Sequence, residues 1–176
     1  MFETIDYLQF GNENQQRAYS AIKNLGIMRS LSEYYPTLCG TLPIGIDIVH
    51  SDLDIIMHVE EFSLFEHKVK ALFGNEQNFT FKKTSIRNTP VVKANFIFEG
   101  FEFELFGQAQ RVKEQYAYLH MIVEDSILKH HPNFKEEVIK LKEQGIKTEP
   151  AFCALLGLEG DPYEALLEYG KQNGFI

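Results

Sequence analysis

The order of apolar and polar residues divides the chain into a strand-rich middle and helical ends. Period-two alternation is typical of strands, whereas apolar residues three or four apart are typical of amphipathic helices. Alternating runs lie between residues 37 and 107, and helical spacing dominates the last third of the chain. We therefore predict an α+β fold, with a mixed sheet flanked by helices and a helical C-terminal part.

The first two thirds of the chain hold the predicted strands. We expect a short helix over 3–10, a helix over 13–25 that Gly26 ends, a further turn over 27–34, and strands over 37–41, 53–59, 79–86, 91–98 and 101–106. Ser63 and Glu66 have capping-box spacing and predict the start of a helix that runs to residue 73. Asn88-Thr89-Pro90 is expected to break the strand over 79–86, and Gly107 to end the strand over 101–106. Two alternating runs around Glu99-Gly100 predict a hairpin.

The last third is expected to contain helices over 113–130, 133–144, 148–156 and 162–171. Asp161 followed by proline is a strong helix start, with a capping carboxylate before the first helical position. We divide the chain into a core over 1–110 and a helical subdomain over 111–176, packed as one compact unit.

Composition narrows the class of protein. The formal net charge of −8 argues against non-specific nucleic-acid binding, which needs a basic face, but it leaves room for a nucleotide. Cys39 and Cys153 lack the spacing of metal ligands and are interpreted as buried residues of a reducing compartment. The first residues lack the pattern of a signal peptide, and no apolar run approaches the ~20 residues of a membrane span. We expect a cytoplasmic protein.

The segment 39–57, CGTLPIGIDIVHSDLDIIM, carries the main candidate chemistry. Asp52 and Asp54 are two residues apart at the start of a predicted strand, so their side chains share a face while Leu53 and Ile55 point inward. Neighbouring carboxylates repel each other unless a cation neutralises them. Hard oxygen ligands on a strand suit Mg²⁺ or Mn²⁺, commonly shared with the phosphates of a substrate.

Gly40 and Thr41 precede this pair by a short loop. A glycine beside a small hydroxyl residue lets the backbone approach a phosphate, to which the amides and the hydroxyl donate. Taken alone, the two aspartates would be interpreted as part of an exposed acidic strand that follows a turn. The preceding Gly-Thr and the apolar continuation favour phosphoryl or nucleotidyl transfer instead.

This arrangement resembles the nucleotidyltransferase superfamily that includes DNA polymerase β. Its signature is Gly with Ser or Thr, a loop of about ten residues, and Asp-x-Asp on a strand; here Thr41 stands where Ser is commoner. The resemblance covers roughly residues 14–107 and is greater to the small bacterial members. More narrowly, GTLPIGIDI, SDLDII, FELFGQ, QYAYLHM and KTEPAFCALLGLEGDPY resemble a bacterial domain family of unknown function assigned to this superfamily.

The resemblance implies a third carboxylate on a neighbouring strand, as metal ligand or general base. Glu102 and Glu104 share one face of the strand 101–106; we favour Glu104, which lies further from the turn, although the superfamily more often uses Asp. The triphosphate needs basic groups, and four residues lie near this region: Lys82, Lys83, Arg87 and Lys93. Period-two spacing does not assign their faces; Arg87 and Lys93 are our candidates.

Two weaker patterns have simpler interpretations. His120 and Glu124 share a helix face near His130 and His131, but without a second histidine four residues from the first, hydrogen-bonded histidines explain them. Lys147 could approach a phosphate from the helical part, although helix capping explains its surroundings.

The sequence therefore predicts a Mg²⁺- or Mn²⁺-dependent nucleotidyltransferase that moves NMP from an NTP to a hydroxyl of an unidentified acceptor. Asp52, Asp54 and Glu104 are the expected catalytic and metal-binding residues. Gly40, Thr41, Arg87 and Lys93 are the expected substrate-binding residues. Two alternatives stay open: a non-catalytic member of the fold that binds a nucleotide or a protein, and a module whose acidic face binds a basic partner. The fold alone chooses neither acceptor nor base, and the sequence does not determine the oligomeric state.

Overall fold

A computed structural model describes residues 2–176. Over these residues the chain forms seven α-helices: α1 (Glu13–Leu25), α2 (Ile27–Ser30), α3 (Phe62–Phe73), α4 (Tyr116–His130), α5 (Phe134–Glu143), α6 (Thr148–Leu156) and α7 (Pro162–Gln172). The described strands are β1 (Thr37–Cys39), β2 (Leu53–His58), β3 (Gln77–Ile86), β4 (Thr89–Phe98) and β5 (Phe101–Gln108). Short 3₁₀ helices cover Asp6–Phe10, Ser32–Tyr34 and Val112–Glu114. The α+β class predicted from the sequence is confirmed.

One mixed sheet organises the middle of the chain. Its strand order is β1-β2-β5-β4-β3. Strand β2 runs parallel to β5, while β1–β2, β4–β5 and β3–β4 are antiparallel. The parallel pair brings residues about 50 positions apart in sequence into adjacent strands, which alternation alone does not reveal.

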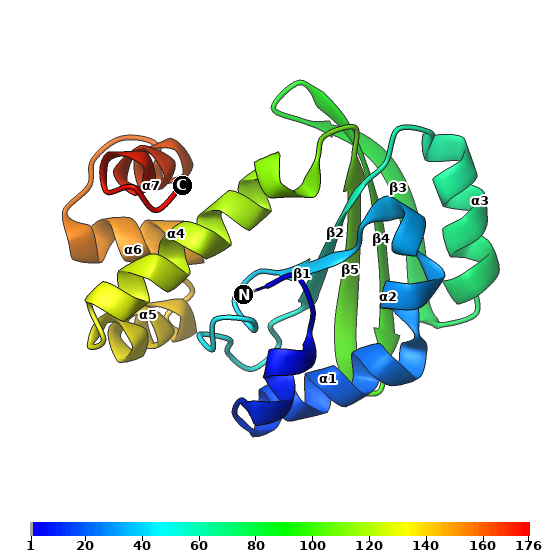
Figure 1. Cartoon of the computed structure of the whole chain (residues 1–176), viewed down its shortest axis with the longest axis horizontal. Coiled ribbons are helices and arrows are strands. Elements are labelled where there is room, and N and C mark those ends of the chain that lie inside the picture. Colours follow the sequence, from blue (N-terminus) through cyan, green and yellow to red (C-terminus); the bar gives the residue numbers. More distant parts are fainter. Residues whose placement is uncertain (1) are drawn as a thin grey trace.

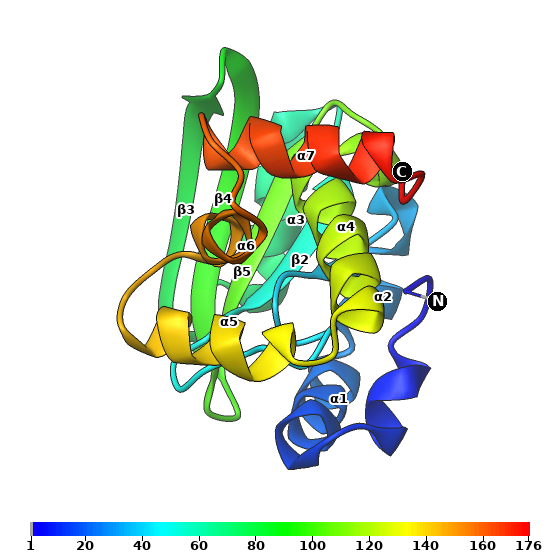
Figure 2. The same cartoon turned by 90° about the vertical axis from the view of Figure 1, so that its left-hand side faces the viewer.

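Helices cover the two faces of the sheet unequally. Helices α1, α2 and α3 pack on one face, and α4 leads away to α5, α6 and α7, which lie beyond the other face (Figure 1). In the perpendicular view α6 and α7 lie in front of the sheet beside β3, with α6 over β4 and β5 (Figure 2). We call α4 to α7, residues 116–172, the helical lobe.

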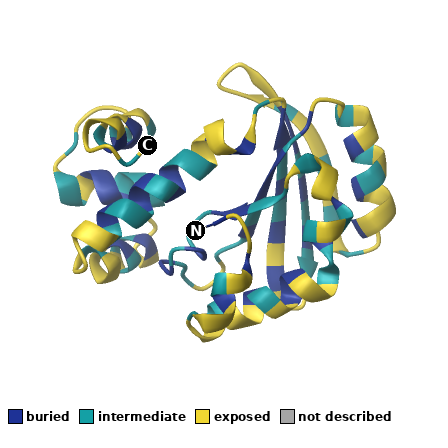
Figure 3. Ribbon diagram, in the orientation of Figure 1, coloured by how far each residue is buried: buried dark blue, intermediate teal, exposed yellow. Residues whose placement is uncertain are grey.

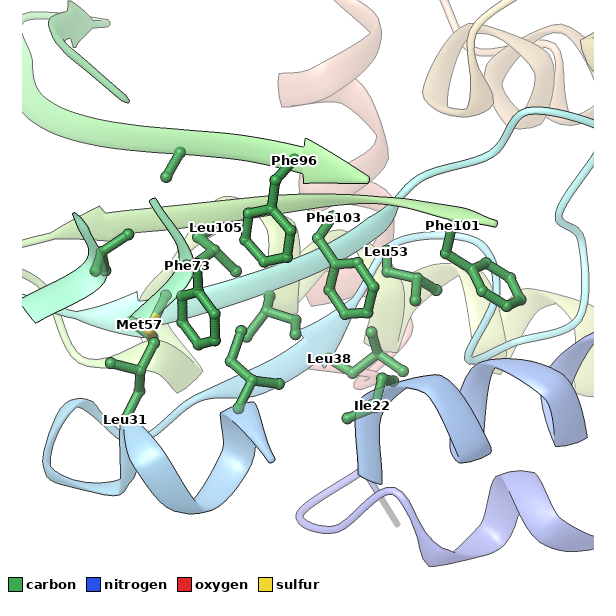
Figure 4. Close-up of a cluster of buried hydrophobic side chains, with 14 of the residues drawn as sticks. Ile22, Leu31, Leu38, Leu53, Met57, Phe73, Phe96, Phe101, Phe103 and Leu105 are labelled. Carbon is green, nitrogen blue, oxygen red and sulfur yellow. The ribbon is translucent and has the colours of Figure 1, made fainter. Parts of the chain in front are cut away.

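The main core lies between the sheet and α1 to α3. Leu53 and Ile55 are fully buried in it, as their alternation with the aspartates predicts. The rings of Phe73, Phe96 and Phe103 stack in succession, with centroid separations of 5.2 and 5.3 Å (Figure 4). Such aromatic stacks fix the sheet against α3 and hold the strands in one register.

Smaller cores attach the helical lobe to the opposite side. Cys39, Ile56 and Met121 pack together on the second face of the sheet. Ile46, from the loop between β1 and β2, packs with residues of α4 to α7. Figure 3 shows buried positions along the strands and the middle of α4, and exposed positions on the outer sides of α1 and α3. Leu42 of the same loop is buried in the main core, so the loop after Gly40 packs against both cores.

Helix ends largely follow the predicted signals. Asn12 forms a capping box at α1, Gly26 ends α1 with a positive φ of 69°, and Asp161 accepts bonds from the amides of Tyr163 and Glu164. The capping box expected at Ser63 is wrong, because α3 already begins at Phe62, and its N-cap residue Glu61 makes no side-chain bond.

Of the two predicted strand breaks, the first is confirmed and the second is wrong. Strand β3 ends at Ile86, just before Arg87 and Asn88, although Pro90 itself lies in β4, paired with Ser85. Gly107 does not end β5 but lies within it, paired with Val92. The β3–β4 turn consists of Arg87 and Asn88, both with positive φ (50° and 63°). Asparagine tolerates this conformation, so the turn forms without glycine.

Candidate active site

The structure brings Asp54 and Glu104 together at the centre of the sheet. Asp54 lies opposite Glu104 in the parallel β2–β5 pair and opposite Cys39 in the β1–β2 pair. Directly opposed residues project their side chains from the same face. Glu102 is exposed and lies two residues earlier in β5, opposite Ile97 of β4. Glu104 is therefore the better placed of the two glutamates to act with Asp54.

Gly40 packs directly against the Asp54 carboxyl group. Its φ is +80°, and a Cβ added there would lie 3.2 Å from Cγ of Asp54 and overlap its Oδ2. Only glycine adopts this backbone freely and leaves room for the carboxylate. The Gly-Thr step therefore lies beside Asp54, while Asp52 directly precedes the first residue of β2.

The loop after Thr41 is held by bonds from both sides. The carbonyl of Thr41 accepts a bond from the Ile46 amide at 3.1 Å. Gln15 of α1 donates to the carbonyl of Leu42 at 2.8 Å, and Lys142 of α5 donates to the carbonyl of Ile46 at 2.7 Å. These bonds fix the path of the loop between Gly40 and Asp52.

The aspartate pair lies in an environment that disfavours its charged form. Burial, followed by the charges of Asp52 and Glu104, raises the pKa of Asp54 to about 8. Burial also raises the pKa of Asp52. Within residues 2–176 no group donates a hydrogen bond to the Asp54 carboxyl group. A carboxyl group in this position would be stabilised by a cation.

Lys93 supplies positive charge at this site. Its Nζ lies 2.8 Å from Oε2 of Glu104. It is paired in register with Phe106, which shares a face of β5 with Glu104. Its charge opposes the pKa-raising effect of burial on both aspartates. Of the basic residues proposed from the sequence, Lys93 is the one that contacts this carboxylate cluster.

The other basic residues lie differently. Lys82 is the cross-strand neighbour of Lys93, whereas Lys83 pairs with Glu66 of α3 at 2.7 Å on the opposite face. Arg87 is at the tip of the β3–β4 hairpin, where it pairs with Glu164 and with Asp161. Its guanidinium also lies over the rings of two helical-lobe tyrosines, 4.9 Å from the centroid of Tyr116 and 5.4 Å from that of Tyr163. Arg87 thus joins the hairpin to the helical lobe.

The helical lobe adds charged residues that sequence reasoning missed as parts of the site. Lys142 is buried in α5, where burial lowers its pKa, and its charge acts on Asp52. Glu149 of α6 lies near enough to raise the pKa of Asp54, after burial and the nearer carboxylates. Lys142 lies four residues after buried Val138 and therefore on the same helix face. A lysine on an apolar helix face could have indicated from the sequence that this charge is buried.

The histidines of α4 make ordinary contacts. Nε2 of His120 lies 2.9 Å from the carbonyl oxygen of Tyr163, and its Nδ1 lies 3.8 Å from Oε1 of Glu149. Nδ1 of His130 lies 2.7 Å from the Ser126 carbonyl oxygen, and His131 stacks on Phe134. Hydrogen bonding and packing account for these residues, as the simpler interpretation predicted.

Asp52, Asp54 and Glu104 fit a hard divalent cation, because they offer only carboxylate oxygens as ligands. Within the described residues, the Asp54 carboxyl group also has no hydrogen-bond donor that would compete with the ion. In the described part of the chain, however, no three His, Cys, Asp or Glu side chains are gathered closely enough to hold a metal ion. Glu104 is directed to Lys93 instead. Completion of the ligand set would therefore require side-chain movement.

Two surface hollows lie elsewhere. One, of about 470 Å³, is lined by the N-terminal segment, α1 and α2. The other, of about 510 Å³, lies between α1, the β1–β2 loop and α5 and includes Asp47 and Lys135. Neither includes the carboxylate cluster, so the candidate site is defined by its side chains alone.

Residues 20–169 match the family described as Domain of unknown function (DUF4269). The chain belongs to this family. No curated protein matches the sequence. Within residues 2–176, none of the helices has the length and apolar character needed to cross a membrane.

Solved structures show the fold of this DUF4269 chain. A Cid1 poly(U) polymerase structure with MgGTP bound has a TM-score of 0.53 at 15% identity, covering 72% of this chain and 41% of that one. A structure related to the RNA terminal uridylyl transferase activity of Cid1 has a TM-score of 0.55 at 14% identity, covering 74% and 41%. A GLD-2/RNP-8 complex gives 0.48 at 14% identity, covering 86% and 57%.

The two Cid1 comparisons establish a nucleotidyltransferase-like fold. The chain spans about two fifths of the length of the Cid1 structures it matches. At this identity the similarity shows the fold alone, so activity has to be argued from the side chains described above.

Proposed function

We propose that this chain is a metal-dependent nucleotidyltransferase that transfers NMP from an NTP to a hydroxyl group of an acceptor. The observation that carries the proposal is the placement of Asp54 between Gly40 and Glu104, in a fold shared with a poly(U) polymerase. Phosphoryl transfer requires a site for the phosphates next to a site for a cation. Here a glycine turn would bind the phosphates, and the neighbouring carboxylates would bind the cation.

Each residue has a distinct proposed role. Asp52 and Asp54 would hold Mg²⁺ or Mn²⁺, with Glu104 as a further ligand or as general base. The ion would neutralise charge on the triphosphate. The amides at Gly40 and Thr41 would donate to the phosphates, and Lys93 would add a point charge. A phosphate contact by Arg87 would require it to leave Glu164 and Asp161, so we place the basic contribution on Lys93.

The proposed reaction is a displacement at the α-phosphorus of the NTP. The acceptor hydroxyl oxygen forms a bond to the α-phosphorus, and the bond between that phosphorus and the bridging oxygen to the β-phosphate breaks. Pyrophosphate carries away the electron pair, and the hydroxyl proton passes to a carboxylate, for which Glu104 is the candidate. The surrounding protein has to position these groups rather than form a covalent intermediate.

A non-catalytic nucleotide-binding protein is the second candidate. The Lys93–Glu104 ion pair favours it, because a neutralised third carboxylate is a poorer base. The main proposal also includes that this protein is bacterial and cytoplasmic and that it acts on a soluble NTP. A protein partner for the acidic surface belongs to the second candidate.

Neighbouring glutamates of β5 provide a matched test. Each of the four labelled NTPs is incubated with Mg²⁺, a cell extract as acceptor source, and either wild type, Glu104→Gln or Glu102→Gln. We expect labelled product from wild type, a loss of roughly 100-fold or more in Glu104→Gln because a general base or ligand is removed, and little change in Glu102→Gln.

The exposed position of Glu102 makes it the control for charge and for strand stability. No labelled product with any NTP would favour the non-catalytic candidate. Equal losses in both variants would contradict the specific role of Glu104.

A further inference from the structure

Lys93 is positioned as an internal cation for the carboxylate cluster. Its ammonium group contacts Glu104 at 2.8 Å, and the two side chains are 30% and 21% exposed. Its charge also reaches Asp52 and Asp54. One lysine thus provides positive charge to all three carboxylates of the proposed site: the two proposed metal ligands and Glu104, the proposed further ligand or general base.

The backbone of Lys93 is fixed within the sheet, whereas its long side chain lets the ammonium group change position. Its backbone is paired on both sides, with Lys82 of β3 and Phe106 of β5, and buried Val92 and Ala94 flank it on the other face. The four-carbon stem of lysine lets its ammonium group reorient while the strand stays in place. Its cross-strand neighbour Lys82 repels it, which favours its present approach to Glu104.

We propose that Lys93 is a displaceable counter-ion: it neutralises Glu104 before substrate binds, and it moves to the triphosphate when the metal–nucleotide complex arrives. This inference rests on the proposed function. The ammonium and the divalent ion compete for the same carboxylate, so the ion alone binds weakly and the nucleotide complex binds better. Metal and nucleotide would thereby be taken up together.

The chain contains a matched control for this exchange. Lys83 is the neighbour of Lys82 in β3 and forms an ion pair of 2.7 Å with Glu66, but on the opposite face of the sheet. Its removal deletes the same charge and a similar pair without touching the carboxylate cluster. Glu104→Gln supplies the second control, because it removes the partner of Lys93.

The test measures binding by the whole chain. Mn²⁺ is titrated without nucleotide, by calorimetry or by the electron paramagnetic resonance of free Mn²⁺, into wild type, Lys93→Met, Lys83→Met and Asp54→Asn. Mg²⁺ with inorganic tripolyphosphate is then titrated into the same proteins. We expect Lys93→Met to bind Mn²⁺ about fivefold more tightly, the effect of removing one unit charge at short range in a solvated site.

The same variant should bind Mg²⁺-tripolyphosphate about tenfold more weakly, because a phosphate partner is lost. Lys83→Met should match wild type in both titrations. In a Glu104→Gln background, the Lys93→Met change should tighten Mn²⁺ binding by less than it does in wild type, because only the longer-range action of the Lys93 charge on Asp52 and Asp54 remains. Circular dichroism and thermal melting of each variant show whether a change in binding reflects loss of folding.

Two results would overturn the inference and are distinguishable. If wild type binds Mn²⁺ through Asp54 but Lys93→Met binds it equally or more weakly, the counter-ion role fails and the proposed function stands. If no protein binds Mn²⁺ in an Asp54-dependent way, the metal site itself fails, and both proposals fall with it.

Discussion

Asp54→Asn is expected to stabilise the metal-free protein and to abolish nucleotide transfer. The carboxyl group of Asp54 is partly buried beside Asp52 and Glu104, and its pKa is raised to about 8. An amide has no charge to be repelled or desolvated, so the folded state gains. The same amide is a poor ligand for a divalent ion, so transfer should fall by roughly a factor of 1,000 or more.

The stability effect should depend on pH. Between about pH 4 and pH 8 the folded protein keeps a proton on Asp54 that the unfolded chain releases. Stability of the metal-free protein therefore falls as pH rises through this window, because the folded state binds more protons. Asp54→Asn should remove this contribution and be more stable by about 1–3 kcal/mol at pH 8.

Urea unfolding of both proteins from pH 5 to pH 8.5, with a chelator present, measures the difference. Glu102→Gln controls for removal of an exposed carboxylate from the same sheet. Parallel pH profiles for wild type and Asp54→Asn would contradict the repulsive environment assigned to Asp54.

Gly40→Ala is expected to disable the site with a large loss of activity. A Cβ at this position overlaps Oδ2 of Asp54, and the φ of +80° strains any other residue. Relief requires either the carboxylate or the loop to shift, and an error of about 1 Å in a catalytic group can cost 100-fold in rate. The strain also destabilises the fold by about 1–2 kcal/mol.

Gly145→Ala is the matched control. Gly145 also has a positive φ of +89°, but a Cβ there would meet nothing within 4 Å. It should therefore lose stability to a similar extent without losing nucleotide binding or transfer. Labelled-NTP transfer and urea unfolding of both variants separate the two effects. Equal losses of transfer in the two variants would show that Gly40 matters only through backbone strain.

Local pattern was enough to predict much of this fold. Alternation placed Leu53 and Ile55 in the core and Asp54 on the other face, and the turn at Glu99-Gly100 produced the expected hairpin. These features depend on neighbouring residues, so one sequence specifies them. The break after Ile86 was predicted from Asn88-Thr89-Pro90, but the tight Arg87-Asn88 hairpin turn was not, because it forms without glycine.

The contacts between distant elements could not be predicted in the same way. The parallel pairing of β2 with β5, which sets Asp54 opposite Glu104, joins segments far apart in the chain. The approach of Lys142 and Glu149 depends on how the helical lobe packs over the sheet. Lys93 was named from the sequence, but its pairing with Glu104 follows from strand register, which alternation leaves open.

Calorimetric titration of NTPs in the presence of Mg²⁺ tests the central claim most directly. ATP, GTP, CTP and UTP are each titrated into wild type and into an Asp52→Asn/Asp54→Asn variant, with and without the ion. We expect wild type to bind at least one NTP in a way that requires Mg²⁺, and the variant to lose that binding. Equal Mg²⁺-dependent binding by both proteins would contradict it.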